Sequence, residues 1–119
     1  MNKEDYVSLE VAKLLKEKEY DEECGLAISI NSREGQRFIS HRTNSLLPRD
    51  ICSKPNLYEA QKWLRNKHKI HICVDFNASG WYCRLYEIIY GEFILQTEGY
   101  KDSYEEALNA GILGALRLI

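Results

Sequence analysis

The chain has 119 residues, of which 45% are apolar and 29% charged, and its formal net charge is −2. This length and apolar content predict a single globular domain over residues 1–119 and exclude a disordered chain. No run of about 18 apolar residues occurs, and the N-terminus lacks the apolar stretch of a secretion signal. We therefore expect a cytoplasmic protein with no membrane partner.

The first predicted element is an amphipathic helix whose periodic pattern runs from Val7 to Lys18, with Ser8 as a suitable N-cap, and which ends around residues 19–24. Residues 8–15 also resemble the first helix of an excisionase-type helix-turn-helix module. A recognition helix should follow that helix within about four residues. Residues 26–30 instead have the pattern of a strand, so we reject this module.

A β-hairpin is predicted next. Residues 26–30 form its first strand, residues 31–35 have the polar, glycine-containing composition of a turn, and residues 36–40 are its partner strand. Periodicity is then lost from His41 to Pro55. That segment is predicted to be a long loop or a poorly ordered arm.

The second half of the chain has the clearest pattern. Residues 56–59 have the form of a capping box and begin a second helix. Three strands joined by short turns are expected to form a meander over residues 70–76, 81–89 and 93–97. A second capping box at residues 103–106 begins a last helix that runs almost to Ile119.

The predicted fold class is therefore α+β, with the element order α-β-β-α-β-β-β-α. Consecutive strands with short connections pair antiparallel, and helices cover the sheet. We expect an antiparallel sheet, made of the N-terminal hairpin and the three-stranded meander, packed with three helices.

Cysteine and histidine residues do not predict a metal site. The four cysteines are expected to be free thiols: Cys24, Cys52, Cys73 and Cys83. The best metal cluster would combine His68, His71, Cys73 and Cys83. If Phe76 pairs near Trp81, Cys83 lies opposite Val74 and faces away from His71 and Cys73, so these ligands diverge. We predict no metal and no cofactor.

Catalytic motifs are missing as well. The sequence contains no phosphate-binding GxxxxGK[ST], no GxGxxG after a strand, no HExxH and no GxSxG. On a strand, His71 and Cys73 would be about 7 Å apart, outside hydrogen-bonding distance. Glu105 and Glu106 lie at the N-terminus of the last helix, where the helix dipole explains them. We predict no catalytic residue and a protein that is not an enzyme.

The aromatic strand supplies the main candidate interaction site. If Trp81, Cys83 and Leu85 face the core, alternation places a second set of side chains on the opposite face: Tyr82, Arg84, Tyr86 and Tyr90. Tyrosine and arginine are enriched in protein-binding hot spots and also stack on bases. The alternative is that helices cover this face, and the register leaves open which face is which.

The last helix contains two glycines, Gly111 and Gly114, although glycine costs about 1 kcal/mol relative to alanine inside a helix. Close packing against the sheet would explain both of them. A close helix–helix contact in a homodimer is the alternative, and it makes both glycines candidate protein-interaction residues.

Basic residues are concentrated in the middle of the chain. Residues 33–72 hold nine Lys or Arg against three Asp or Glu, whereas the rest holds seven against fifteen. Lys62, Arg65 and Lys69 share one face of the second helix and are the candidate nucleic-acid contacts. The alternative is the solvated face of an amphipathic helix, and a sequence pI near 5.9 argues against a dedicated nucleic-acid binder.

Three segments carry a family resemblance: residues 6–15 (YVSLEVAKLL), 56–72 (NLYEAQKWLRNKHKIHI) and 103–112 (SYEEALNAGI). In this order they are similar to segments of small phage- and prophage-encoded proteins of gut Bacteroidetes. These motifs are helix caps and apolar stripes, and that family has no assigned activity. The resemblance implies a phage or prophage origin and a bacterial cytoplasm, and it assigns no functional residue.

These observations favour a small accessory protein that acts as a non-enzymatic binding module. Its partner would be another protein or, in a homodimer, a second copy of the chain. The alternative is a nucleic-acid-associated accessory protein that uses the basic face of the second helix.

Overall fold

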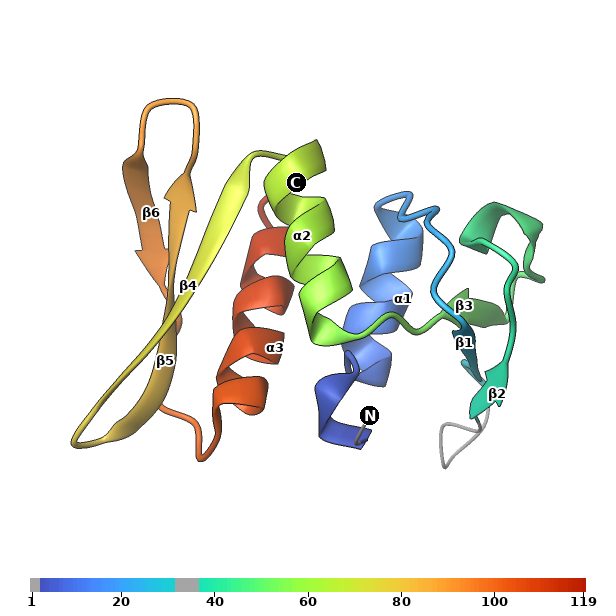
Figure 1. Cartoon of the computed structure of the whole chain (residues 1–119), viewed down its shortest axis with the longest axis horizontal. Helices are drawn as coiled ribbons and strands as arrows, with labels where there is room; N and C mark the ends of the chain where they lie inside the picture. The colour runs from blue at the N-terminus through green and yellow to red at the C-terminus, as the bar shows by residue number, and fades with distance from the viewer. Residues whose placement is uncertain (1–2, 32–36) are drawn as a thin grey trace. The chain divides into compact units, whose positions relative to one another are not determined.

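The computed structural model describes residues 3–31 and 37–119 (Figure 1). Its helices are α1 (Leu9–Glu17), α2 (Leu57–Lys67) and α3 (Tyr104–Leu116), with short 3₁₀ turns at Lys3–Asp5 and Asn44–Leu46. Its strands are β1 (Leu26–Ser29), β2 (Arg37–Ile39), β3 (Ile51–Ser53), β4 (Ile70–Asn77), β5 (Gly80–Glu87) and β6 (Glu92–Gln96). The α+β class and the predicted order of elements are confirmed.

The strands form two separate three-stranded antiparallel sheets, in the orders β2-β1-β3 and β4-β5-β6. The chain also divides into two compact units, Met1–Glu59 and Ala60–Ile119. We call them unit 1 and unit 2 and describe each by itself. One domain over residues 1–119 stays a prediction.

In unit 1, the predicted helix and hairpin are present. The Ser8 Oγ accepts a hydrogen bond of 3.3 Å from the Val11 N–H, as an N-cap does, and the buried side of α1 consists of Val11, Ala12 and Leu15. In the hairpin, Ala27 of β1 pairs with Phe38 of β2. The turn predicted at residues 31–35 lies outside the described residues except for Asn31.

The prediction of a loop from residue 41 to residue 55 was wrong, because β3 lies within it and pairs with β1. Hydrogen bonds from distant side chains hold this segment. The buried Asn44 amide donates to the Tyr20 carbonyl at 2.7 Å, and its oxygen accepts from the Ser53 N–H at 2.8 Å. Lys16 donates to the carbonyls of Pro48 and Ile51. Such pairings leave no periodic pattern in the sequence.

The capping box at α2 is confirmed in both directions, and the N-cap half of the box at α3 is confirmed. At the start of α2, the Asn56 Oδ1 accepts from the Glu59 N–H at 2.8 Å, and the Glu59 carboxylate accepts from the Asn56 N–H at 3.2 Å. At the start of α3, the Ser103 Oγ accepts from the Glu106 N–H at 3.1 Å. These local bonds fix where each helix begins.

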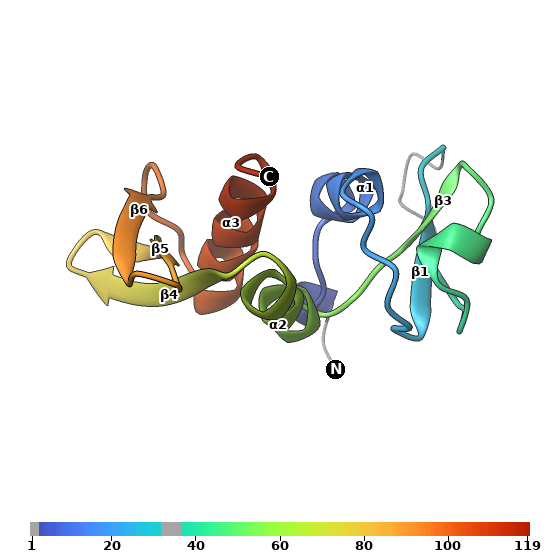
Figure 2. The same cartoon turned by 90° about the horizontal axis from the view of Figure 1, so that it is seen from above.

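In unit 2, the predicted hairpin register is also confirmed: Phe76 pairs with Trp81, and Val74 with Cys83. Figure 2 shows α3 on one side of β4, β5 and β6. The residues of β5 that face α3, Cys83 and Leu85, have no exposed surface. Within the described part of the chain, no helix combines the length and apolar character that crossing a membrane requires.

Candidate functional site

The candidate site is the face of the β4–β5–β6 sheet that points away from α3. Residues that pair directly across two strands share a face, so the register places three pairs there: His71 with Tyr86, Cys73 with Arg84, and Asp75 with Tyr82. Figures 1 and 2 show no helix of unit 2 on this side of the strands within the described residues. We call these six residues, together with Phe93 of β6, the open face.

Arg84 is at the centre of the open face and is held by Tyr82. One Arg84 guanidinium nitrogen donates to the Tyr82 hydroxyl at 3.3 Å, and the Arg84 Cζ is 5.5 Å from the centroid of the Tyr82 ring. The Tyr100 ring packs edge-on against the Tyr82 ring at 5.7 Å, so only 6% of Tyr82 is exposed. Tyr82 is therefore a support for Arg84 and offers almost no contact surface of its own.

The electrostatic surroundings keep Arg84 charged. Tyr82 and then a hydrogen bond to Tyr86 raise the pKa of the Arg84 guanidinium, which is already above the physiological range. Arg84 itself is half-buried. The open face thus presents a permanent positive charge whose position is fixed by aromatic neighbours.

Tyr86 connects the three strands of this face. Its ring centroid lies 6.5 Å from that of His71 on β4 and 5.9 Å from that of Phe93 on β6. His71 is exposed, as is 57% of Phe93, and Tyr86 is half-buried. The result is an ordered row of rings with accessible edges.

Tyr90 was predicted to lie on the open face, and this prediction was wrong. The strand β5 ends at Glu87, so the alternation that placed Tyr90 with Tyr86 stops before it. Tyr90 lies in the β5–β6 turn with 81% of its surface exposed. The Glu87 carboxylate accepts hydrogen bonds from the N–H groups of Ile89 and Tyr90 at 2.7 and 3.0 Å, and these bonds set the shape of the turn.

Gly111 is explained by packing against the sheet, which was the first of the two predicted alternatives. A Cβ atom at this position would lie 2.8 Å from both the Cys83 Sγ and the Ile72 Cγ2. Gly111 is therefore enclosed by the strands and cannot contact a second copy of the chain. Gly114 is looser, because the nearest atom to its Cβ would be the Leu85 Cδ2 at 3.9 Å.

The candidate nucleic-acid residues lie near the end of α2. Lys62 is exposed and Arg65 is half-buried. Lys69 follows the helix with a φ of 58°, and its ammonium group donates to the Asn66 carbonyl at 2.9 Å. Lys69 therefore caps the C-terminus of the helix, where a cation interacts favourably with the helix dipole.

The cysteine and histidine side chains do not come together. All four cysteines are free thiols, and Cys73 and Cys83 lie on opposite faces of their sheet. Burial raises the pKa of the Cys83 thiol to about 12, and the thiol donates to the Ala107 carbonyl at 3.0 Å. Such a thiol is a poor nucleophile. Across residues 3–31 and 37–119, no three His, Cys, Asp or Glu side chains are grouped to hold a metal ion.

Sequence reasoning missed His71 and Phe93 as members of the interaction site. The sequence suggested His71 as a metal ligand or as the partner of a cysteine nucleophile, although its predicted position on the strand already placed it on this face. Phe93 was hidden because the pairing of β6 shifts between Leu85 and Tyr86, which is a β-bulge. A bulge breaks the alternation of side chains, so a period of two cannot assign the face of Phe93.

The comparisons identify no relative. No protein-family model, curated protein or solved structure matches the chain significantly. The resemblance of residues 6–15, 56–72 and 103–112 to phage-encoded proteins therefore stays a prediction. The candidate site stands on its own geometry.

Proposed function

We propose that the chain is a non-enzymatic protein-binding module whose partner binds the open face of the β4–β5–β6 sheet. The observation that carries this proposal is Arg84, a charged group held by Tyr82 and flanked by Tyr86 on a face that no helix of the unit covers within the described residues. Arginine and tyrosine are enriched among the residues that dominate binding energy. Rings already fixed by neighbours lose little conformational entropy on binding.

The charge around the open face favours a protein partner over a nucleic acid. Among Lys and Arg, residues 70–97 contain only Arg84. The same range contains three acidic residues, Asp75, Glu87 and Glu92. A polyanion would be repelled by this balance, because nucleic-acid binding depends on several phosphate contacts at once. One arginine among aromatic rings instead suits a single carboxylate or carbonyl group on a protein surface.

The proposal places the module in a bacterial cytoplasm as a phage or prophage accessory protein. This part depends on the resemblance of the three segments given above. The partner is another protein or a second copy of the chain bound through the same face.

The test is affinity capture from a lysate of the organism that encodes the chain. We expect Arg84→Glu and Phe93→Ala each to reduce the recovery of one specific bound protein by about tenfold or more. Lys62→Glu is the matched control, since it changes an exposed charge on α2. Equal recovery of every bound protein by the Arg84→Glu variant would overturn the proposal.

A second candidate function is nucleic-acid association through α2. It is supported by Lys62 and Arg65 on α2 and by Lys69 just after it, with no acidic residue between Lys62 and Lys69. Light scattering at about 50 and about 500 mM salt, with and without a mixed-sequence DNA fragment, tests it. A complex that forms only at low salt and is lost when Lys62, Arg65 and Lys69 are all changed to Glu would establish this function instead.

A further inference from the structure

Among residues 3–31 and 37–119, the outer backbone groups of β2 have no hydrogen-bond partner. In an antiparallel sheet, successive residues direct their N–H and C=O groups alternately toward the strands on either side. The Ser40 N–H donates to the Gly25 carbonyl at 3.1 Å, and the same register pairs Phe38 with Ala27. The backbone groups of Arg37 and Ile39 therefore point away from β1, toward the edge of the sheet.

The opposite edge of the same sheet, at β3, is closed by its own chain. The Ile51 N–H donates to the Pro48 carbonyl at 3.0 Å, and the Ile51 carbonyl accepts from Lys16. The Ser53 N–H donates to the Asn44 side chain at 2.8 Å. These bonds occupy the groups that another strand would need.

The edges in unit 2 are protected in part. On β4, the Ile72 carbonyl accepts from the Gln61 amide at 3.0 Å, and the Phe76 N–H donates to the Asp75 carboxylate at 2.8 Å. On β6, the β-bulge interrupts the strand. Side-chain caps and bulges are the usual devices that keep sheet edges from pairing with other chains. Among the described residues, the backbone of Arg37 and Ile39 has no such device.

The surface beside β2 is hollowed and exposes apolar side chains. A shallow hollow of about 460 Å³ is lined by Tyr6, Leu26, Arg37, Phe38 and Ile39. The strand itself is exposed, with 79% of Ile39 and 37% of Phe38 accessible. A strand that added to β2 could place an apolar side chain in this hollow.

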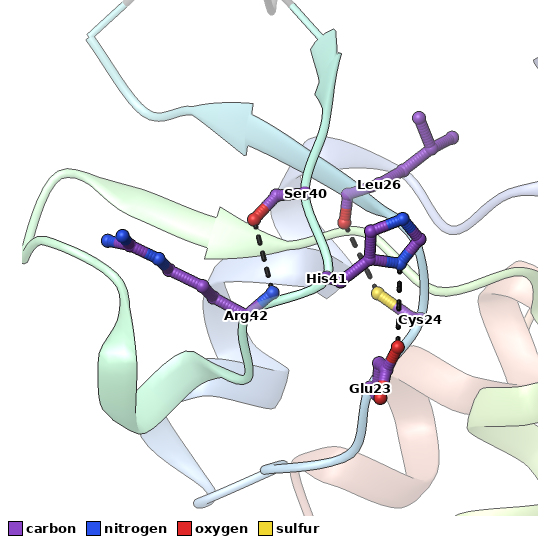
Figure 3. A network of polar contacts seen from close by, with 6 residues as sticks. All are labelled: Glu23, Cys24, Leu26, Ser40, His41 and Arg42. Carbon is purple, nitrogen blue, oxygen red and sulfur yellow. Dashed lines mark hydrogen bonds and ion pairs between the residues drawn. The ribbon is translucent and has the colours of Figure 1, made fainter.

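The charge next to this edge is positive. Residues 37–42, which form β2 and the segment after it, contain Arg37 and Arg42 and neither Asp nor Glu. Figure 3 shows an ion pair near this edge, in which the His41 Nδ1 is 3.4 Å from the Glu23 carboxylate. Both side chains are exposed, so the pair contributes little to stability. Figure 3 also shows the Arg42 side chain extending away from that pair.

From these observations we infer that β2 is a second docking site, which binds an extended segment of a partner protein by β-strand addition. The segment alternates apolar and acidic residues: its backbone bonds to Arg37 and Ile39, its apolar side chain enters the hollow, and its carboxylates face the arginines. A second copy of β2 is a poor occupant, because antiparallel self-pairing would bring Arg37 and Arg42 of both copies into one patch. This site is separate from the open face of unit 2.

The first test uses a labelled peptide of about six residues in which valine alternates with glutamate, followed by fluorescence anisotropy. We expect saturable binding, and at least tenfold weaker binding of the matched peptide in which valine alternates with lysine. Ile39→Pro removes an N–H that makes no bond to β1, and edge strands tolerate proline. It should weaken binding about tenfold or more, whereas Ile39→Ala, which keeps the donor, should have a smaller effect.

Charge and backbone readouts complete the test. Changing Arg37 and Arg42 together to Glu should weaken binding about tenfold, while Lys62→Glu should leave it unchanged. In the unaltered chain, amide hydrogen exchange at Arg37 and Ile39 should slow when the valine–glutamate peptide is added, which tests strand addition even if Ile39→Pro does not fold. Equal binding of the lysine peptide, or no slowing at these two amides, would overturn the inference. Slowing that depends on protein concentration without peptide would assign the edge to a second copy instead.

Discussion

The two units each contain a three-stranded sheet, but the two sheets are held together in different ways. In unit 2, the two eight-residue strands β4 and β5 pair in continuous register, and α3 covers one face through Gly111. In unit 1, the strands have four, three and three residues, and side chains distant in sequence hold them: Lys16, Asn44 and Lys54. The comparison teaches that long strands carry their own pairing information, whereas short strands depend on specific polar contacts.

The largest effect is expected where unit 1 depends on one side chain. Asn44→Ala removes the hydrogen bonds of this side chain to the buried Tyr20 carbonyl and to the Ser53 N–H. We expect the free energy of unfolding to fall by about 2–5 kcal/mol, because each unsatisfied buried group costs about 1–3 kcal/mol. Urea unfolding measures it.

The control for this prediction is Asn31→Ala. Asn31 is exposed, and its amide is 3.4 Å from the Asp50 carboxylate, so its loss should change stability by less than about 0.5 kcal/mol. If Asn44→Ala costs no more than Asn31→Ala, unit 1 does not depend on these contacts.

The packing of unit 2 is tested by its two helical glycines. At Gly111, an added methyl group would overlap Cys83 and Ile72, so Gly111→Ala should destabilise the chain by about 1–2 kcal/mol despite the better helix propensity of alanine. At Gly114, the nearest atom is 3.9 Å away, so Gly114→Ala should stabilise the chain by up to about 1 kcal/mol. Thermal unfolding of both variants gives the comparison. The same sign at both positions would contradict the packing of α3 described above.

The start of α3 should show a smaller effect. Ser103→Ala removes the acceptor for the Glu106 N–H and should cost about 1 kcal/mol in urea unfolding. Ser79→Ala, in the β4–β5 turn, is the control and should cost less than about 0.5 kcal/mol. A Ser103→Ala variant as stable as the control would mean that the capping box does not hold the helix.

The smallest effect concerns the pH dependence of unit 2. Burial, and then the charge of Lys67, lowers the pKa of His68. The His68 Nε2 has no hydrogen-bond partner among the described residues, and the centroid of its ring is 4.8 Å from that of Trp63. As the pH falls below about 6.5, His68 binds more protons in the unfolded chain than in the folded chain. The free energy of unfolding therefore falls as the pH falls. His68→Phe should lose less stability than the unaltered chain between pH 7.5 and pH 5. Identical losses, measured by urea unfolding, would show that His68 does not titrate differently in the two states.

The sequence predicted most of unit 2 and only part of unit 1, because local signals can be found in a sequence and contacts between distant residues cannot. Capping boxes at Asn56 and Ser103 and the alternation of residues 70–76 are local signals, and they placed α2, α3 and the register of β4 with β5. The strand β3 was missed because what holds it is a contact between Asn44 and Tyr20, which no periodicity encodes. In the candidate site, Arg84 and Tyr86 followed from alternation. Tyr90 did not, because β5 ends at Glu87, and Phe93 was hidden by the bulge.

The most direct test of the central claim is site-specific photocrosslinking at the open face. A photoreactive benzoylphenylalanine is installed in place of Tyr86, with the same group in place of Tyr58, an exposed residue of α2, as the matched control. After irradiation in cells, we predict a covalent adduct between the Tyr86-substituted chain and one defined protein, lost when Arg84→Glu is added. Adducts that form only from the Tyr58 position, or that survive Arg84→Glu, would contradict the claim that this face binds the partner.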